Sequence, residues 1–132
     1  MFLDSSALVA ILLGESDAMV LRAKLKANRR FTSPIVIYET TMAVMRDNQK
    51  SMTEAHAKVM ALLKAYRVQI LQIQGHHAEL ALEACARFGR GSRHPAKLNM
   101  GDCFSYACAV KLDVPLLFIG NDFIQTEGIK FA

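Results

Sequence analysis

The stretch from Leu98 to Leu112, LNMGDCFSYACAVKL, places the tightest constraint on how this chain can fold. It opens with helix-start signals, because Asn99 can cap a helix and an acid follows three residues later. Beyond Asp102 nearly every residue is apolar or small, and a helix that is apolar on all sides belongs inside a protein. A carboxylate at the mouth of such a helix is costly unless something compensates its charge.

The composition is that of a compact globular protein. The 132 residues are 52% hydrophobic and 21% charged, so we expect a single domain, 1–132, with a proper core. No run approaches the ~18 apolar residues of a membrane span, and no basic residue precedes the apolar segment Ala7–Leu13, as a signal peptide requires. We therefore expect a cytoplasmic protein without membrane contact. The net charge of +4 permits an anionic partner without requiring one.

Cysteine and histidine usage argues against a metal framework of the zinc type. Cys85, Cys103 and Cys108 are odd in number and lack CxxC spacing, which favours reduced thiols. The histidines show no ligand spacing either. We expect no disulfide framework and no zinc site.

Short apolar runs alternate with helical patterns along the chain. We expect strands at 1–4, 31–32, 68–73 and 116–119, an edge strand at 129–131, and helices at 7–13, 17–27, 34–48, 54–67, 76–88 and 100–112, with Ser33 and Thr53 as helix caps. This alternation predicts a three-layer α/β domain with a small, mostly parallel sheet. In such sheets, sites form beyond the carboxyl ends of the strands.

Acidic residues gather at the carboxyl ends of the predicted strands, an edge of the sheet that we call the rim. Asp4 and Asp122 each come directly after a predicted strand. Asp102 begins a helix that runs antiparallel to the strand it leads into, so the start of that helix lies at the same rim. We therefore expect these three carboxylates to lie close together.

A fourth acid, Glu39, is abnormally placed. The helix that starts at Ser33-Pro34 has one row of positions spaced as a single helix face. This row consists of Ile35, Glu39, Met42, Ala43 and Arg46. Glu39 therefore falls inside the predicted apolar stripe of the helix.

Each acid also has a plain structural explanation. Asp4 could cap the first helix and Asp122 a turn, while Asp102 could complete a capping box with Asn99. Glu39 could pair with a buried Arg or Lys. Together they are harder to dismiss, because two close carboxylates repel by up to ~4 kcal/mol at an effective dielectric near ~20. Such a cluster needs protons, basic side chains or a divalent cation.

An all-oxygen set of Asp and Glu ligands suits Mg²⁺ or Mn²⁺. Two such ions about 4 Å apart can activate a water and stabilise the leaving oxygen of a phosphodiester.

Four segments of the chain carry a resemblance to a known family. They are LDSSALVA at 3–10, YET at 38–40, LNMGDCFSYA at 98–107 and PLLFIGNDF at 115–123. Together they resemble PIN-domain ribonucleases and, within these, the VapC toxins of bacterial type II toxin–antitoxin modules. The resemblance implies a PIN-like α/β/α fold and a Mg²⁺-dependent endoribonuclease. It also implies a cognate VapB-type antitoxin as partner, with assembly as a homodimer or a toxin–antitoxin hetero-oligomer.

The resemblance also assigns roles to residues at the rim. Asp4, Glu39, Asp102 and Asp122 take the places of the family's acidic metal-site residues, with Asp4 and Asp102 most directly tied to Mg²⁺. Ser6 matches a small hydroxyl residue that could orient Asp4 or a metal-bound water. Asn121, beside Asp122, is a further auxiliary candidate.

Basic residues fall within or just before the loop that precedes Asp102. They are Arg87, Arg90, Arg93, His94 and Lys97. They are either a solvated loop surface or a rim that contacts the phosphates of RNA, which attract basic side chains. Few aromatic residues lie nearby, so nothing indicates recognition of stacked bases.

Two other functions compete with the nuclease. A phosphoryl-accepting α/β domain would use Asp4 as acceptor, but the chain offers no second nearby Asp and no Gly-rich phosphate loop. A catalytically inactive PIN module would instead hold RNA or antitoxin without cutting.

Overall fold

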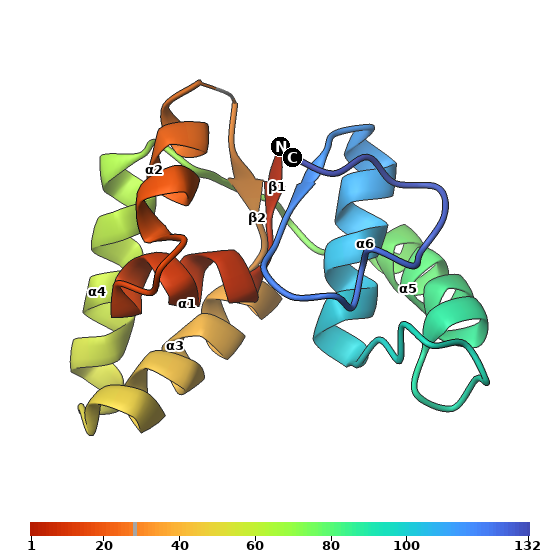
Figure 1. The fold of residues 1–132 in the computed structure, drawn as a ribbon, viewed down its shortest axis with the longest axis horizontal. Helices are drawn as coiled ribbons and strands as arrows, with labels where there is room; N and C mark the ends of the chain where they lie inside the picture. Colours follow the sequence, from red (N-terminus) through yellow and green to blue (C-terminus); the bar gives the residue numbers. More distant parts are fainter. Residues whose placement is uncertain (28) are drawn as a thin grey trace.

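In the computed structural model, which describes residues 1–27 and 29–132, helices and very short strands alternate along the chain (Figure 1). The elements are β1 Phe2–Leu3, α1 Ser5–Leu13, α2 Ala18–Ala27, β2 Phe31–Thr32, α3 Pro34–Asn48, α4 Met52–Ala65, β3 Gln69–Ile70, α5 Gly75–Phe88, α6 Met100–Leu112 and β4 Leu116–Leu117. No helix of the described residues combines the length and the apolar character needed to cross a membrane.

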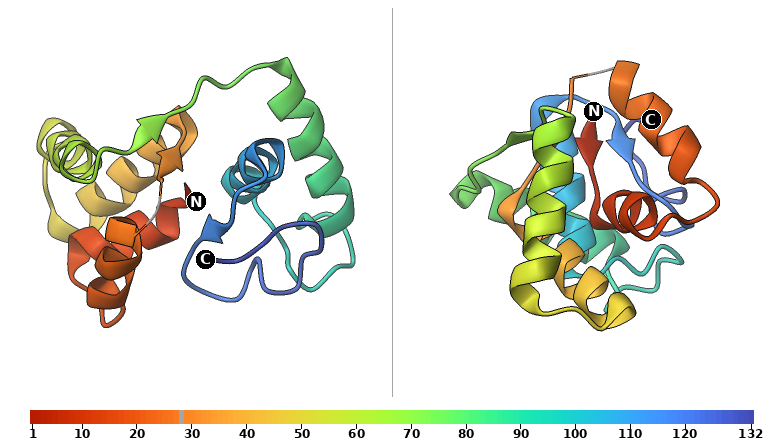
Figure 2. Two further views of the ribbon diagram at one scale, coloured as in Figure 1. Left: turned by 90° about the horizontal axis from the view of Figure 1, so that it is seen from above. Right: turned by 90° about the vertical axis from the view of Figure 1, so that its left-hand side faces the viewer.

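The strands form one parallel sheet between two helical layers. The strand order is β3-β2-β1-β4, and Phe2 of β1 pairs with Phe31 on one side and Leu116 on the other. Helices α1 to α4 lie on one side of the sheet and α5 and α6 on the other (Figures 1 and 2). The predicted three-layer α/β fold is confirmed, and the sheet is parallel at every pairing.

Helix α6 lies in the interior, as its composition predicts. Its buried residues cover nearly the whole circumference of the helix; they are Gly101, Cys103, Ser105, Tyr106, Ala107, Cys108 and Ala109. The helix begins with a capping box: Asp102 N–H donates to Asn99 Oδ1 at 2.9 Å, and Asn99 N–H donates to Asp102 Oδ2 at 2.8 Å. Asp102 therefore takes part in the N-terminal capping of α6, as its position in the sequence indicates.

Several predicted boundaries are corrected by local hydrogen bonding. Helix α1 begins at Ser5 because the Asp4 side chain already caps it. Helix α4 is capped by Ser51, since Ser51 and Glu54 complete a capping box; the prediction of Thr53 as the cap was wrong.

The weakest strand predictions also change. The strand expected at 68–73 is reduced to Gln69 and Ile70, both exposed at the edge of the sheet. Within the described residues, the expected strand at 129–131 is only an isolated bridge between Phe131 and Leu116. A single partner strand gives such edge segments few backbone hydrogen bonds.

Candidate active site

Asp4 follows the carboxyl end of β1, one of the two inner strands of the sheet, and is only 2% exposed. Its Oδ2 accepts hydrogen bonds from Ser6 N at 3.0 Å and Ser6 Oγ at 2.6 Å. Its Oδ1 accepts one from Ser105 Oγ at 2.7 Å. Both carboxylate oxygens are therefore compensated by donors from the chain, and the side chain has a fixed orientation.

Ser6 and Ser105 connect Asp4 to the neighbouring elements. The Ser6 hydroxyl also accepts a hydrogen bond from Ile119 N at 3.0 Å, which joins α1 to the segment after β4. Ser105 comes from α6 and is completely buried. Sequence reasoning missed Ser105, although its place three residues after Asp102, on the same helix face, was the available signal.

Glu39 reaches the same rim from α3, which lies on the opposite side of the sheet from α6 (Figure 1). An ideal Cβ at Gly101 would lie 1.9 Å from Glu39 Oε1, so the carboxylate packs directly on the backbone of α6. Its Oε2 is buried and has no hydrogen-bond partner among the described residues. Burial, followed by the charges of Asp4 and Asp102, raises the pKa of Glu39 to about 7, against a hydrogen bond from Ser5.

The row of α3 that contains Glu39 is not the buried one. The buried side chains of α3 are Val36, Thr40, Thr41 and Val44. The predicted apolar stripe through Glu39 was therefore wrong, because the helix turns a neighbouring row into the core. Glu39 instead borders an open cavity of about 430 Å³ between α1 and α3.

Asp102 is half-buried and lies within electrostatic range of the other acids. Burial raises its pKa to about 6. The Asn99 N–H bond and the charge of Arg90 lower it, whereas the charges of Asp4 and Asp122 raise it further. The capping bond thus compensates Asp102 only in part.

Asp122 is less firmly placed than the other acids. Strand β4 ends at Leu117, so the prediction that Asp122 directly follows a strand was wrong. Asp122 and Asn121 are both exposed in the loop beyond it. The Asp122 charge nevertheless acts on Asp102, which puts it on the same side of the molecule.

No basic side chain of the described residues is paired with the four acids of the rim. The ion pairs of the described residues, Arg87–Glu127 and Lys130–Asp113, involve none of the four acids. In the same part of the chain, no group of three or more Asp, Glu, His or Cys side chains is arranged so that it could hold a metal ion as it stands, so the acids would have to move together to bind one. The buried Oε2 of Glu39 is costly without a partner, and carboxylate oxygens are the kind of ligand that Mg²⁺ prefers.

The predicted basic residues divide into two groups. Arg87 stacks on Phe88, with its guanidinium 4.6 Å from the ring centroid, and pairs with Glu127 at 3.4 Å. His94 is half-buried, lies edge-on to Phe88, and its Nδ1 accepts a hydrogen bond from Ala96 N at 3.2 Å. Both side chains thus have contacts inside the protein.

The remaining three, Arg90, Arg93 and Lys97, are exposed in the segment between α5 and α6. The charge of Arg90 acts on Asp102, so this part of the loop borders the acids.

Comparison with known proteins agrees with this geometry. The model of the PIN domain family matches residues 1–129. Ribonuclease VapC42 of Mycobacterium tuberculosis is 40% identical over 96% of this chain and 95% of its own length. A VapC ribonuclease of Rhizobium meliloti is 35% identical over 96% of this chain and 97% of its own length.

Two solved structures share the fold. Mycobacterium tuberculosis VapC20, described as a sarcin-ricin loop cleaving toxin, has a TM-score of 0.76 at 19% identity and covers 97% of this chain and 95% of its own. VapBC2 of Rickettsia felis, solved with a promoter DNA fragment, has a TM-score of 0.69 at 18% identity, covering 99% and 96%. By sequence and by fold, the chain belongs to the PIN domain family, among the VapC ribonucleases.

Proposed function

We propose that this chain is a Mg²⁺-dependent endoribonuclease, the toxin of a type II toxin–antitoxin system. The observation that carries the proposal is the buried Oε2 of Glu39, which has no hydrogen-bond partner and no basic side chain paired with it in the described part of the chain, beside Asp4 and Asp102. The naming of its relatives as ribonucleases supports the same activity.

Asp4, Glu39 and Asp102 would hold the metal, with Asp122 completing the set from its exposed loop. Mn²⁺ shares the preference of Mg²⁺ for carboxylate oxygens. When bound, such an ion supplies an activated water and stabilises the leaving oxygen of the phosphodiester.

The chain's own side chains prepare the site. Ser6 and Ser105 are positioning residues, because their hydroxyls fix both oxygens of Asp4. Gly101 gives Glu39 room to reach the rim. With its pKa raised to about 7, Glu39 is partly protonated near neutrality, and a cation would replace that proton; Asp102, with a pKa of about 6, is mostly ionised there.

The exposed Arg90, Arg93 and Lys97 would contact the phosphates of RNA beside the acids. We assign Arg87 a weaker contact, since Glu127 already offsets its charge. His94 would act indirectly, by holding the loop against Phe88.

A VapB-type antitoxin is the partner that the proposal requires. The Rickettsia felis relative is named as a VapBC pair, which supports such a partner here. Assembly would be as a homodimer or a toxin–antitoxin hetero-oligomer, acting in the cytoplasm where its RNA substrates are found.

A phosphoryl-accepting role for Asp4 is poorly supported. The carboxylate is 2% exposed and both of its oxygens accept hydrogen bonds from serine donors.

The test is cleavage of RNA by the wild type, Asp4→Asn and Asp102→Asn, with Mg²⁺ and with chelator. Asparagine keeps the capping acceptor at both positions, so the fold should persist. We expect cleavage only by the wild type with Mg²⁺, and losses of at least ~10²-fold in the variants, because metal binding contributes several kcal/mol to the transition state. The matched control is Asp113→Asn, an exposed acid paired with Lys130, which should retain activity.

Equal cleavage by all four proteins would contradict the proposal. If Mg²⁺ raises the melting temperature of the wild type but no RNA is cut, the chain is the inactive module instead.

A further inference from the structure

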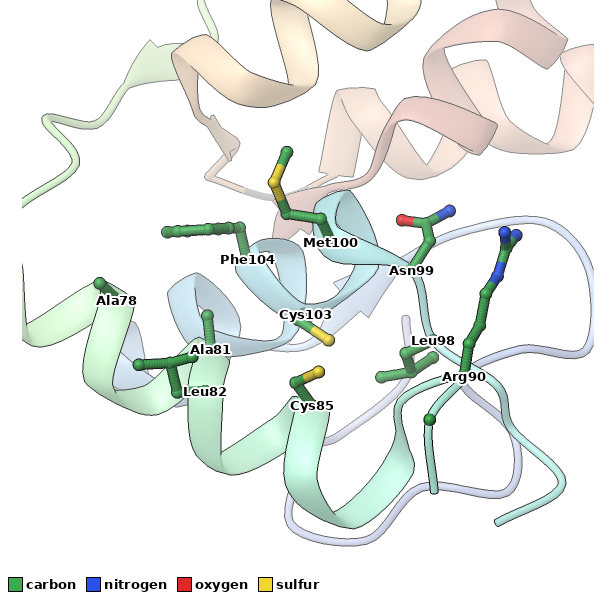
Figure 3. Close-up of a pocket in the computed structure, with 11 residues that line it drawn as sticks. Ala78, Ala81, Leu82, Cys85, Arg90, Leu98, Asn99, Met100, Cys103 and Phe104 are labelled. Carbon is green, nitrogen blue, oxygen red and sulfur yellow. The ribbon is translucent and has the colours of Figure 1, made fainter. Parts of the chain in front are cut away.

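A pocket lies between α5 and α6 (Figure 3). The pocket has a volume of about 580 Å³, and its walls are largely apolar, with Leu82, Leu98 and Phe104 among them. Two cysteines line it from opposite helices, Cys85 from α5 and Cys103 from α6. Their sulfur atoms face each other across the helix interface (Figure 3).

Burial, with a smaller contribution from the Cys85 side chain, raises the pKa of Cys103 to about 12. A protonated thiol is a poor nucleophile, so we expect the attack by Cys103 to be the slow step of any exchange. The Cys85 sulfur is also packed from behind, because an ideal Cβ at Gly89 would lie 2.9 Å from its Sγ. Gly89 on one side and Cys103 on the other therefore restrict where the Cys85 sulfur can point.

The cysteines differ in access to solvent. Cys85 is exposed, whereas Cys103 is 2% exposed and Cys108, also on α6, is completely buried. Cys108 does not line the pocket. A reagent that enters the pocket therefore meets Cys85 first, finds Cys103 behind it, and has no route to Cys108 from there.

We propose that Cys85 and Cys103 form a modification site for low-molecular-weight disulfides such as glutathione disulfide, which convert the pair into an internal disulfide bond. The site needs no metal and no RNA, so it stands whether or not the chain is a nuclease.

The reaction is an ordinary pair of thiol–disulfide exchanges. Cys85 Sγ attacks one sulfur of the reagent, the reagent's S–S bond breaks, and one small thiol leaves. Cys103 Sγ then attacks Cys85 Sγ and displaces the second small thiol. Both cysteines are oxidised by one electron each, the reagent is reduced to two thiols, and those thiols carry away the two protons.

The bond would join α5 to α6 at the residue that follows Asp102. It would also tie the end of α5, where the basic loop begins, to the helix that carries a proposed metal ligand. Formation of the disulfide would therefore link α5 and α6 covalently across the pocket.

The experiment treats the native full-length protein with excess glutathione disulfide, blocks remaining thiols by alkylation, and measures intact mass and peptide masses. We expect the wild type to lose two of its three free thiols without retaining glutathione. Cys103→Ser should retain one glutathione on Cys85, because no second thiol displaces it. Cys85→Ser should not react, since its remaining thiols are buried.

Cys108→Ser is the matched control, and it should form the same internal disulfide as the wild type. The proposal is overturned if the wild type keeps all three thiols, retains glutathione as Cys103→Ser does, or forms chain-to-chain disulfides on a non-reducing gel. A non-native linkage to Cys108 in the peptide map would overturn it as well.

Discussion

Asp4 and Glu39 stand at the same rim, yet the chain treats their carboxylates in opposite ways. Asp4 is more deeply buried, but three donors from Ser6 and Ser105 compensate its charge. Glu39 is less buried, but one of its oxygens has no partner in the described part of the chain, and its pKa is raised to about 7. Burial alone does not determine the cost of a carboxylate; the supply of donors does.

This difference in hydrogen bonding predicts that the two carboxylates affect different properties of the protein. The neighbourhood of Asp4 is organised before any ion arrives, so its loss should affect the rate and the affinity for metal. One oxygen of Glu39 has no partner in the absence of the proposed cation, so removal of its charge should affect the stability of the metal-free protein.

Ser105→Ala tests the Asp4 side of this comparison and should have the largest effect. Removing a hydroxyl that orients a metal ligand, the role that we propose for Asp4, typically costs ~10–100-fold in metal affinity or activity. We expect RNA cleavage to fall by this factor and the Mg²⁺ concentration for half-maximal rate to rise. Ser51→Ala, which removes the cap hydroxyl of α4 far from the acids, is the control for stability alone. An unchanged Mg²⁺ dependence in Ser105→Ala would mean that Asp4 needs no positioning.

Glu39→Gln tests the Glu39 side of the comparison. In the presence of chelator, the variant should be more stable than the wild type at pH 7.5 by on the order of 1 kcal/mol, after discounting for the solvent exposure of the carboxylate. Saturating Mg²⁺ should stabilise it less than it stabilises the wild type. Thermal unfolding with and without Mg²⁺ measures both. A variant that is less stable than the wild type without metal would show that Glu39 is compensated after all.

The smallest effect should be in the pH dependence of the metal-free protein. Glu39 and Asp102 have pKa values raised to about 7 and about 6 from 4.5 and 3.8, so the folded state holds protons that the unfolded state releases. Their contribution to stability is therefore fully present below about pH 4 and is lost as the pH rises through about 7.

We expect the melting temperature with chelator to be a few degrees higher at pH 5.5 than at pH 7.5, and the difference to shrink in Glu39→Gln. A melting temperature that rises with pH, or an equal pH dependence in the wild type and in Glu39→Gln, would show that Glu39 is compensated as well as Asp4 is.

Local signals explain what could be predicted from the sequence. Ser33 and Pro34 start α3 where expected, and the capping box of α6 is visible in Asn99 and Asp102. The order of elements and the apolar composition of 116–119 were enough for the layered fold. These features depend on neighbouring residues or on periodicity, both of which a sequence displays.

Contacts between distant segments could not be predicted. The hydrogen bond from Ser105 to Asp4 and the packing of Glu39 on Gly101 arise only when α6 and α3 meet at the end of the sheet. The row of α3 that faces the core also depends on its neighbours, and for this reason the stripe through Glu39 was misassigned. The prediction of a strand at 129–131 was wrong for a similar reason. Within the described residues this segment forms one bridge to the sheet, between Phe131 and Leu116.

Gly101 leaves room for the Glu39 carboxylate against α6. Since Glu39 Oε1 occupies the space that a Cβ at this position would need, the two helical layers meet here through the end of one side chain and a bare backbone. A methyl group at residue 101 would force the carboxylate, the far end of a flexible side chain, to turn aside without changing any charge. Gly101→Ala would therefore change where Glu39 stands relative to Asp102, and with it the shape of the cation site that we propose for these acids.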